Sequence, residues 1–230
     1  RQLYFTNEGS TKPGLDGATY DWRRVERISL DKTWRMTVIT DINEPRGLAL
    51  DLTESMLFYL DKEKVKKSLL DGSDLKVILD GKLRDPNGLS FDEGHLYVTD
   101  SAEKNKSSSA QLLRLNVATG DRGDDWVPHK LSNNVSTPKG LAVHGDTLYY
   151  SDWSAEDPST GSIKSFSIRF GVDNNVILSG MRPTGLHYSP LARRKQDSME
   201  EWCAANTKCS NGCTKKIGTA PTCICPDQTA

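Results

Sequence analysis

Three aspartates, Asp61, Asp100 and Asp152, stand where a carboxylate could bind a metal ion or transfer a proton. Each ends a short run of aromatic and apolar residues. Carboxylate oxygens are preferred ligands of Ca²⁺, and a positioned carboxylate can act as a general acid or base. These three, however, recur at equivalent places in similar segments, as structural residues do. We therefore expect them to accept backbone N–H bonds from their own turn or from the next repeat.

Other groups with catalytic potential lack a supporting pattern. The four histidines show no metal-binding spacing, and none lies beside a serine or cysteine nucleophile with a supporting acid: they are His95, His129, His144 and His187. The sequence contains no glycine-rich phosphate loop, Walker motif or Gly-x-Ser-x-Gly elbow. We therefore predict a protein that is not an enzyme, with no catalytic residue, no metal site and no cofactor.

The charge balance limits the classes of partner. Thirty basic and 31 acidic residues leave a net charge of -1, which gives no bulk attraction to nucleic acid or to an anionic membrane. No apolar run reaches the roughly 18 residues of a membrane span. We expect a protein ligand, or neighbouring domains of a larger assembly, as the partner. Membrane contact is expected only through an anchor outside this sequence.

The cysteines point to an oxidising compartment. All five lie near the end of the chain, at Cys203, Cys209, Cys213, Cys223 and Cys225. Dense cysteines in a segment too small to build its own core are typical of a disulfide scaffold in an extracellular protein. An odd count leaves either a free thiol or a partner beyond Ala230, and we expect the second. No signal peptide opens the sequence, so a mature extracellular fragment is predicted, either secreted or part of a single-pass ectodomain.

Two glycosylation sequons agree with that compartment. Asn105-Lys106-Ser107 and Asn134-Val135-Ser136 each lie in a polar, loop-like stretch. A glycan could face water in such a stretch, although three-residue patterns also arise by chance. Asn105 and Asn134 are therefore predicted as glycosylation sites.

The elements that carry these residues form a repeat. A Pro-x-Gly-Leu segment begins at residues 45, 86, 138 and 183, and an aromatic segment begins at residues 3, 57, 96 and 148. The alternation of apolar and polar residues favours strands over helices. A more polar strand and a fourth strand follow in each unit, as in 65–70 and 75–79. Four antiparallel strands, repeated every 40 to 50 residues or so, predict the blades of a β-propeller.

The order of the strands bears on ring closure. The chain opens on a second strand, 3–7, and its last β segment, 185–188, is predicted to be a first strand. In a closed propeller that segment would complete the blade begun near the N-terminus. Two interpretations remain open at this point. The chain forms a ring of four blades, or it belongs to a larger ring with blades outside this sequence.

The motifs resemble those of a known family. The aromatic-Thr-Asp strand, the Pro-x-Gly-Leu strand and Leu70-Asp71-Gly72-Ser73 are similar to the YWTD, or class B, repeats of the low-density lipoprotein receptor family, and the likeness covers nearly the whole chain. Residues 1–100 look most like a membrane-anchored arthropod member of this class. No repeat carries the full Tyr-Trp-Thr-Asp motif. Asn7 replaces its aspartate, Leu60 its threonine and Val98 its tryptophan.

The resemblance implies a domain organisation. Residues 1–191 would be four blades of a six-bladed YWTD propeller whose two upstream blades lie outside the chain, 192–202 a linker, and 203–230 a truncated module of the epidermal-growth-factor type. In such a module the first cysteine pairs with the third and the second with the fourth. This implies the disulfides Cys203–Cys213 and Cys209–Cys223, with the partner of Cys225 absent.

Two functions from different classes follow. The leading expectation is a non-catalytic extracellular receptor-type module that presents a rigid propeller face to a protein ligand. Loops before each first strand and after each second strand form such a face, which predicts these binding residues: Asn43, Glu44, Arg46, Asn87, Lys139, Trp153, Arg182 and Thr184. The alternative is a calcium-dependent six-bladed hydrolase or lactonase, in which Asp85, Asn87 and Asn134 could be ligands.

Overall fold

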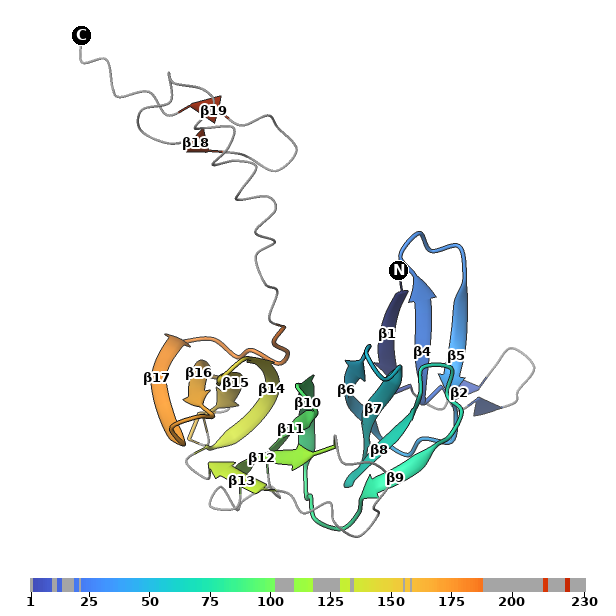
Figure 1. Cartoon of the computed structure of the whole chain (residues 1–230), viewed down its shortest axis with the longest axis horizontal. Coiled ribbons are helices and arrows are strands. Elements are labelled where there is room, and N and C mark those ends of the chain that lie inside the picture. Colours follow the sequence, from blue (N-terminus) through green and yellow to red (C-terminus); the bar gives the residue numbers. More distant parts are fainter. Residues whose placement is uncertain are drawn as a thin grey trace. The chain divides into compact units, whose positions relative to one another are not determined.

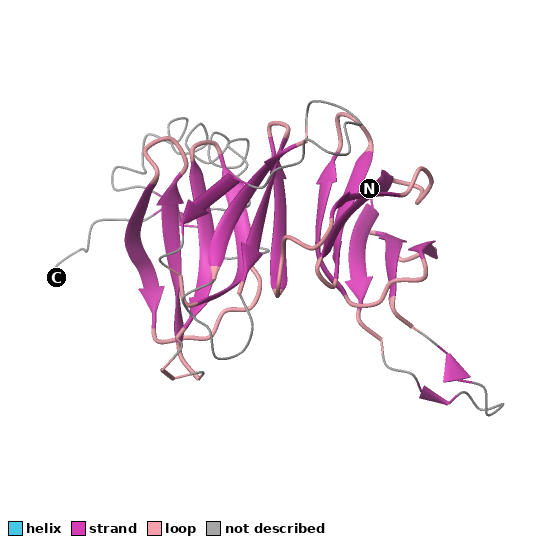
Figure 2. Cartoon of the chain, turned by 90° about the horizontal axis from the view of Figure 1, so that it is seen from below, coloured by secondary structure: helices cyan, strands magenta, loops and turns pink. Residues whose placement is uncertain are grey.

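Strands account for all the regular structure among the residues described by our computed structural model (Figure 2). The structure describes residues 2–9, 12–13, 19–20, 22–101, 110–117, 129–132, 135–154, 156–157, 159–187, 213–214 and 222–223. Within these ranges, no helix is long and apolar enough to span a bilayer. The chain divides into two units, Arg1–His187 and Tyr188–Ala230, which are described separately.

The first unit contains four antiparallel sheets, here called blades A to D, that follow one another in sequence order (Figure 1). Blade A comprises β1 (Gln2–Asn7), β4 (Arg24–Ser29) and β5 (Arg35–Ile39). Blade B comprises β6 (Pro45–Asp51), β7 (Met56–Asp61), β8 (Lys64–Leu69) and β9 (Lys76–Leu79). Blade C comprises β10 (Pro86–Asp92), β11 (His95–Asp100), β12 (Gln111–Asn116) and β13 (His129–Ser132). Blade D comprises β14 (Thr137–His144), β15 (Thr147–Trp153), β16 (Gly161–Ser167) and β17 (Val172–Ser179).

Two short hairpins complete the described strands. The first, β2 (Lys12–Pro13) with β3 (Thr19–Tyr20), lies between β1 and β4 in the sequence. The other belongs to the second unit and pairs β18 (Cys213–Thr214) with β19 (Thr222–Cys223). The remaining cysteines and the asparagines of both sequons lie outside the described residues. The disulfides, the glycans, the growth-factor-like module and the linker bounds therefore stay predictions.

The predicted all-β propeller blades are confirmed, but one predicted strand is wrong. Residues 182–187 form no strand, although 185–188 were expected to be the first strand that completes the blade begun near the N-terminus. In blades B, C and D each first strand pairs with a second strand that follows it closely in sequence. The expected partner of this segment is β1, but β1 pairs only with β4 among the described strands. Sequence alternation alone does not form a strand when the partner is missing.

The Pro-x-Gly-Leu motif produces the same irregularity in three blades. The pairing of first and second strands shifts register between Pro45 and Leu48, and likewise in the motifs of blades C and D. This is a β-bulge, which bends the strand where the motif's glycine lies. A Cβ atom on Gly47 would lie 2.7 Å from the backbone oxygen of Asn87, at the same motif in blade C. Glycine is therefore required for the close approach of successive first strands.

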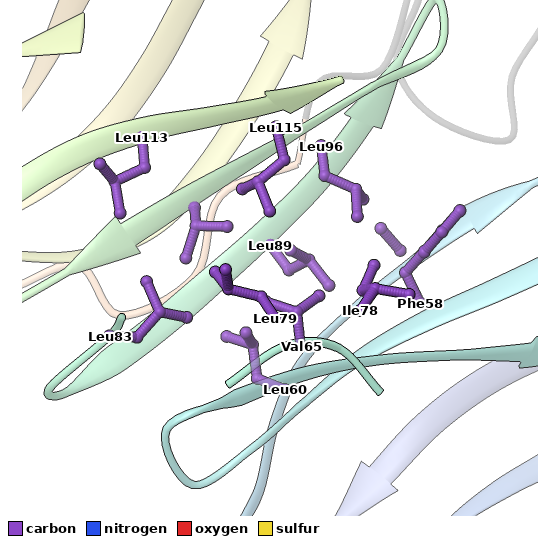
Figure 3. Packing of buried hydrophobic residues seen from close by; sticks show 12 residues of the cluster. Phe58, Leu60, Val65, Ile78, Leu79, Leu83, Leu89, Leu96, Leu113 and Leu115 are labelled. Atoms are coloured by element: carbon purple, nitrogen blue, oxygen red, sulfur yellow. The ribbon is translucent and has the colours of Figure 1, made fainter. Parts of the chain in front are cut away.

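Apolar side chains fill the spaces between neighbouring blades. The largest cluster lies between blades B and C (Figure 3) and includes Phe58, Leu60, Leu89, Leu96 and Leu115. A second cluster joins blades C and D, and a third joins blades A and B. Three of the four aromatic residues at equivalent motif positions belong to these clusters, namely Phe58, Tyr97 and Tyr4, whereas Tyr149 lies outside them.

Candidate ligand-binding face

The repeated aspartates hold the loops that build one face of the first unit. In blade B, the Asp61 carboxylate accepts the backbone N–H groups of Asn43 and Glu44, at 2.9 and 3.0 Å. Asp100 does the same for residues 84 and 85, and Asp152 for residues 136 and 137. Each aspartate therefore ties the end of a second strand to the loop before the first strand of its own blade. The predicted structural role is confirmed, and these bonds stay within the blade.

Two of these carboxylates are also paired with a lysine on the third strand. Lys66 lies 2.6 Å from Asp61, and Lys164 lies 2.7 Å from Asp152. Burial of Asp61 opposes its ionisation, but the hydrogen bonds from Lys66 and from the two backbone N–H groups hold the pKa of its carboxyl below the usual range. In blade C the position equivalent to Lys66 is occupied by Leu113, which cannot form an ion pair. Gln111 donates a hydrogen bond to Asp100 instead, at 3.3 Å.

The loops so held surround a hollow of about 690 Å³ at the starts of the first strands. Its lining comes from all four blades and from the segment that follows β17. These residues are Thr6, Glu8, Gly9, Arg23, Asn43, Glu44, Pro45, Arg46, Gly47, Leu48, Asn87, Gly88, Leu89, Lys139, Gly140, Leu141, Trp153, Thr184, Gly185 and Leu186. We call this surface the hollow face.

Arg46 links blade B to blade C across the hollow face. Its guanidinium group pairs with the Asp85 carboxylate and donates to the backbone oxygen of Pro86, at 2.9 Å. It also lies 2.5 Å from the Glu44 carboxylate, so one arginine bridges two acids. Burial alone would raise the pKa of the Asp85 carboxyl. The hydrogen bond from Arg46 and the charges of Lys139 and Arg46 outweigh that effect and hold the pKa low.

Lys139 extends the charged network to blade D. Its Nζ donates to Asn87 Oδ1 at 3.1 Å, lies 3.6 Å from Asp85 Oδ2, and lies 5.3 Å from the ring centre of Trp153. Burial lowers the pKa of this amine, and the Asp85 carboxylate opposes the shift only in part. Lys139 is thus a partly buried cation held by contacts to blade C and to an aromatic ring.

Trp153 is the aromatic centre of the network. Its indole Nε1 donates to the backbone oxygen of Pro183 at 2.6 Å, which fixes the ring in place. The guanidinium carbon of Arg182 lies 3.8 Å from the ring centre, within the range of a cation–π interaction. Arg182 and Thr184 are exposed, and Trp153 is half-buried. The tryptophan therefore has both a structural contact and an accessible surface.

The structure brings most of the predicted binding residues together. Seven of the eight line the hollow, and the eighth, Arg182, lies over the ring of Trp153. Sequence reasoning named Asp85 only as a possible calcium ligand and missed its pairing with Arg46. A signal was present, because Asp85 precedes Pro86 as Glu44 precedes Pro45. The contributions of Thr6, Glu8 and Arg23 were also missed, because blade A lacks the motif that identifies this face elsewhere.

The geometry fits a calcium site poorly. Asp85 and Asn87 were the possible ligands of the enzyme alternative, with Asn134 outside the described residues. The oxygens of both side chains already accept hydrogen bonds from Arg46, and that of Asn87 also from Lys139. Over the described ranges, no three His, Cys, Asp or Glu side chains are grouped so as to hold a metal ion.

Comparison with known proteins identifies relatives among insect proteins. Cueball of Drosophila grimshawi is 37% identical over 110 residues, which cover 45% of this chain and 16% of that protein. Cueball of Drosophila virilis is 27% identical over 232 residues, covering 98% of this chain and 32% of that protein. This chain is similar in sequence to cueball. The vitellogenin receptor Yl of Drosophila melanogaster is 29% identical over 196 residues, covering 81% of this chain and 9% of the receptor.

Solved structures agree on the fold. No protein-family model matches the chain. The nidogen/laminin complex contains a chain with a TM-score of 0.50 at 18% identity, covering 81% of this chain and 80% of that one. A putative TolB from Agrobacterium tumefaciens gives a TM-score of 0.54 at 18% identity, covering 72% of this chain and 57% of that one. Both are β-propellers. The expected resemblance to receptor-type YWTD propellers and to cueball is confirmed. The chain spans at most about a third of the length of these curated relatives.

Proposed function

We propose that this chain is part of a non-catalytic, extracellular receptor-type module whose hollow face binds a protein ligand. One observation carries the proposal. The second residue of the Pro-x-Gly-Leu motif is Arg46, Asn87, Lys139 and Thr184 in turn, whereas its neighbours repeat. These four varied side chains all line the same hollow. The repeated residues build the scaffold, and the varied ones form a specific surface.

The chemistry of this surface suits a protein partner. Charged groups held by a network are already oriented, so little side-chain freedom is lost on binding. A tryptophan and arginines surrounded by polar groups are the residue types enriched at binding hot spots. The sequence similarity to a vitellogenin receptor and the likeness to a propeller from the nidogen/laminin complex support a receptor-type, protein-binding role.

Charge reversal tests the proposal. Wild-type chain and the variants Arg46→Glu, Lys139→Glu and Arg182→Glu are measured against an array of purified secreted and cell-surface proteins. We expect one or more proteins to bind the wild type and to lose binding to these variants, by about tenfold or more for the hot-spot residues. Lys82→Glu is the matched control, because Lys82 is exposed and does not line the hollow.

Folding of each variant is checked by circular dichroism and thermal unfolding. Arg46 and Lys139 are partly buried, so Arg182→Glu is the decisive variant, since Arg182 is exposed. If a ligand binds all three variants as tightly as the wild type, the hollow face is not its binding site.

A further inference from the structure

A second hollow lies at the other end of the first strands. It occupies about 870 Å³ between blades B and C, where the β6–β7 and β10–β11 turns lie. Pro45 lines the hollow face and Asp51 lines this second site. The six residue steps between them, at about 3.3 Å each, separate the two sites by roughly 20 Å. We call the second site the acidic groove.

The floor of the acidic groove is apolar. The rings of Phe58 and Phe91 stack there, with their centres 5.6 Å apart and their planes at 15°. Met56 and Val117 also line the groove and are only partly buried. Leu52 lies at the groove with 74% of its surface exposed. An apolar hollow next to an exposed leucine offers contact area to an apolar side chain of a partner.

The lining carries a strong excess of negative charge. The lining contains one ammonium group, that of Lys67, and the five carboxylates of Asp51, Glu54, Asp74, Asp92 and Glu93, of which Asp74 is paired with Lys76 at 3.3 Å. The Asp51 carboxylate already has partners in its own turn, because it accepts hydrogen bonds from the backbone N–H groups of Thr53 and Glu54. Glu54 and Glu93 are exposed, so they can meet a partner's charges without first being desolvated.

We propose that the acidic groove binds a basic protein segment in which an aromatic or aliphatic side chain is flanked by lysines or arginines. The apolar side chain would lie on Phe91 and Met56, and the flanking cations would face Glu54 and Glu93. Nucleic acid and anionic membranes carry the wrong charge for this site. The proposal does not depend on the hollow face, since the two sites share no lining residue.

The test uses a labelled peptide as the probe. Fluorescence anisotropy at low ionic strength measures binding of fluorescein-Lys-Lys-Leu-Phe-Lys-Lys to the full 230-residue chain. We expect saturable binding that weakens roughly fivefold in the double variant Glu54→Gln/Glu93→Gln, because two solvent-exposed ion pairs with the peptide are lost. Leu52→Ser is expected to weaken binding as well. The matched control is Glu63→Gln/Glu156→Gln, which removes the same charge from exposed residues that line neither hollow, and it is expected to bind like the wild type.

Two peptide controls separate the groove from general charge attraction. Replacing Leu-Phe by Ser-Ser keeps the charge and removes the apolar side chains, and we expect binding to be lost. Replacing the lysines by glutamates is also expected to abolish it. Equal binding of the Ser-Ser peptide, or an unchanged affinity in the Glu54→Gln/Glu93→Gln variant, would overturn the proposal.

Discussion

Asp61 and Lys66 form a buried ion pair, with 2.6 Å between Oδ2 and Nζ and with side chains that are only 1% and 14% exposed. The same carboxylate accepts two backbone N–H groups of the loop before β6. This pair therefore connects the third strand of blade B to the loop that carries Asn43 and Glu44. The geometry of the hollow face thus depends on two residues that do not line it.

Replacing Asp61 is expected to destabilise the fold. Asp61→Asn keeps an oxygen for the backbone N–H groups but leaves the Lys66 ammonium without its counter-charge, which should cost about 1–3 kcal/mol in the free energy of unfolding. Asp61→Ala should cost more, because the N–H groups lose their acceptor too. Urea unfolding measures both. Asp74→Asn is the control: its pair with Lys76 is exposed, so a change within about 0.5 kcal/mol is expected. Equal effects of Asp61→Asn and Asp74→Asn would contradict the role of burial.

Acid should weaken the fold through the same carboxylate. The folded-state pKa of Asp61 lies below its ordinary value of 3.8, and that of Glu26 lies below 4.5, chiefly because Arg35 donates hydrogen bonds to Glu26. Carboxyls with a depressed pKa contribute stability that is complete above their unfolded values and is lost as the pH falls through the folded ones. We expect the free energy of unfolding to fall below about pH 5. The free energy of unfolding should fall less steeply with pH in Asp61→Asn than in the wild type. An identical pH dependence in the wild type and in Asp61→Asn would contradict the contribution of the Asp61–Lys66 pair.

Two glycines at equivalent motif positions should respond differently to alanine. A Cβ on Gly88 would clash with the backbone of Lys139, whereas nothing lies within 4 Å of a Cβ on Gly185. Gly88→Ala should therefore lower the free energy of unfolding by about 1–3 kcal/mol or more. Gly185→Ala should be near neutral. Thermal and urea unfolding of both variants test this, and a large loss in Gly185→Ala would mean that another segment packs against that position.

The Thr99 hydroxyl is expected to stabilise the junction of blades C and D. It accepts the N–H of Gly88 at 2.8 Å and donates to the backbone oxygen of Lys139 at 2.5 Å. Thr99→Val keeps the shape but leaves buried polar groups unpaired, which should cost about 1–3 kcal/mol. Thr99→Ser keeps the hydroxyl and should cost less. The prediction fails if valine and serine destabilise the chain equally in urea unfolding.

Calcium is expected to leave the melting temperature unchanged. A channel-bound ion would stabilise the folded chain according to its affinity and concentration. The side-chain oxygens of Asp85 and Asn87 instead accept hydrogen bonds from Arg46 and Lys139. Scanning fluorimetry with and without millimolar Ca²⁺ makes the measurement, and magnesium serves as the control cation. A large rise with calcium alone would revive the enzyme alternative.

Sequence reasoning succeeded where the determining contacts are close along the chain. The strands of blades B to D, and the gathering of residues around the Pro-x-Gly-Leu motif at one hollow, follow from a repeat that can be read directly. The structural role of Asp100 was also predictable, because an acceptor at a strand end satisfies N–H groups of a nearby loop. It failed at 185–188, where alternation suggested a strand but no pairing partner is described.

The sequence by itself thus determined the blades and the loops that each blade presents, because alternation, turns and bulges depend on neighbouring residues. Only the tertiary structure decided which side chains of different blades meet. Contacts across the gaps between neighbouring blades join Arg46 to Asp85, Lys139 to Asn87, and Phe58 to Phe91. These contacts depend on how one blade stacks on the next. That stacking is determined by the close approach of first-strand backbones and by the packing of the inter-blade cores, which no local pattern encodes.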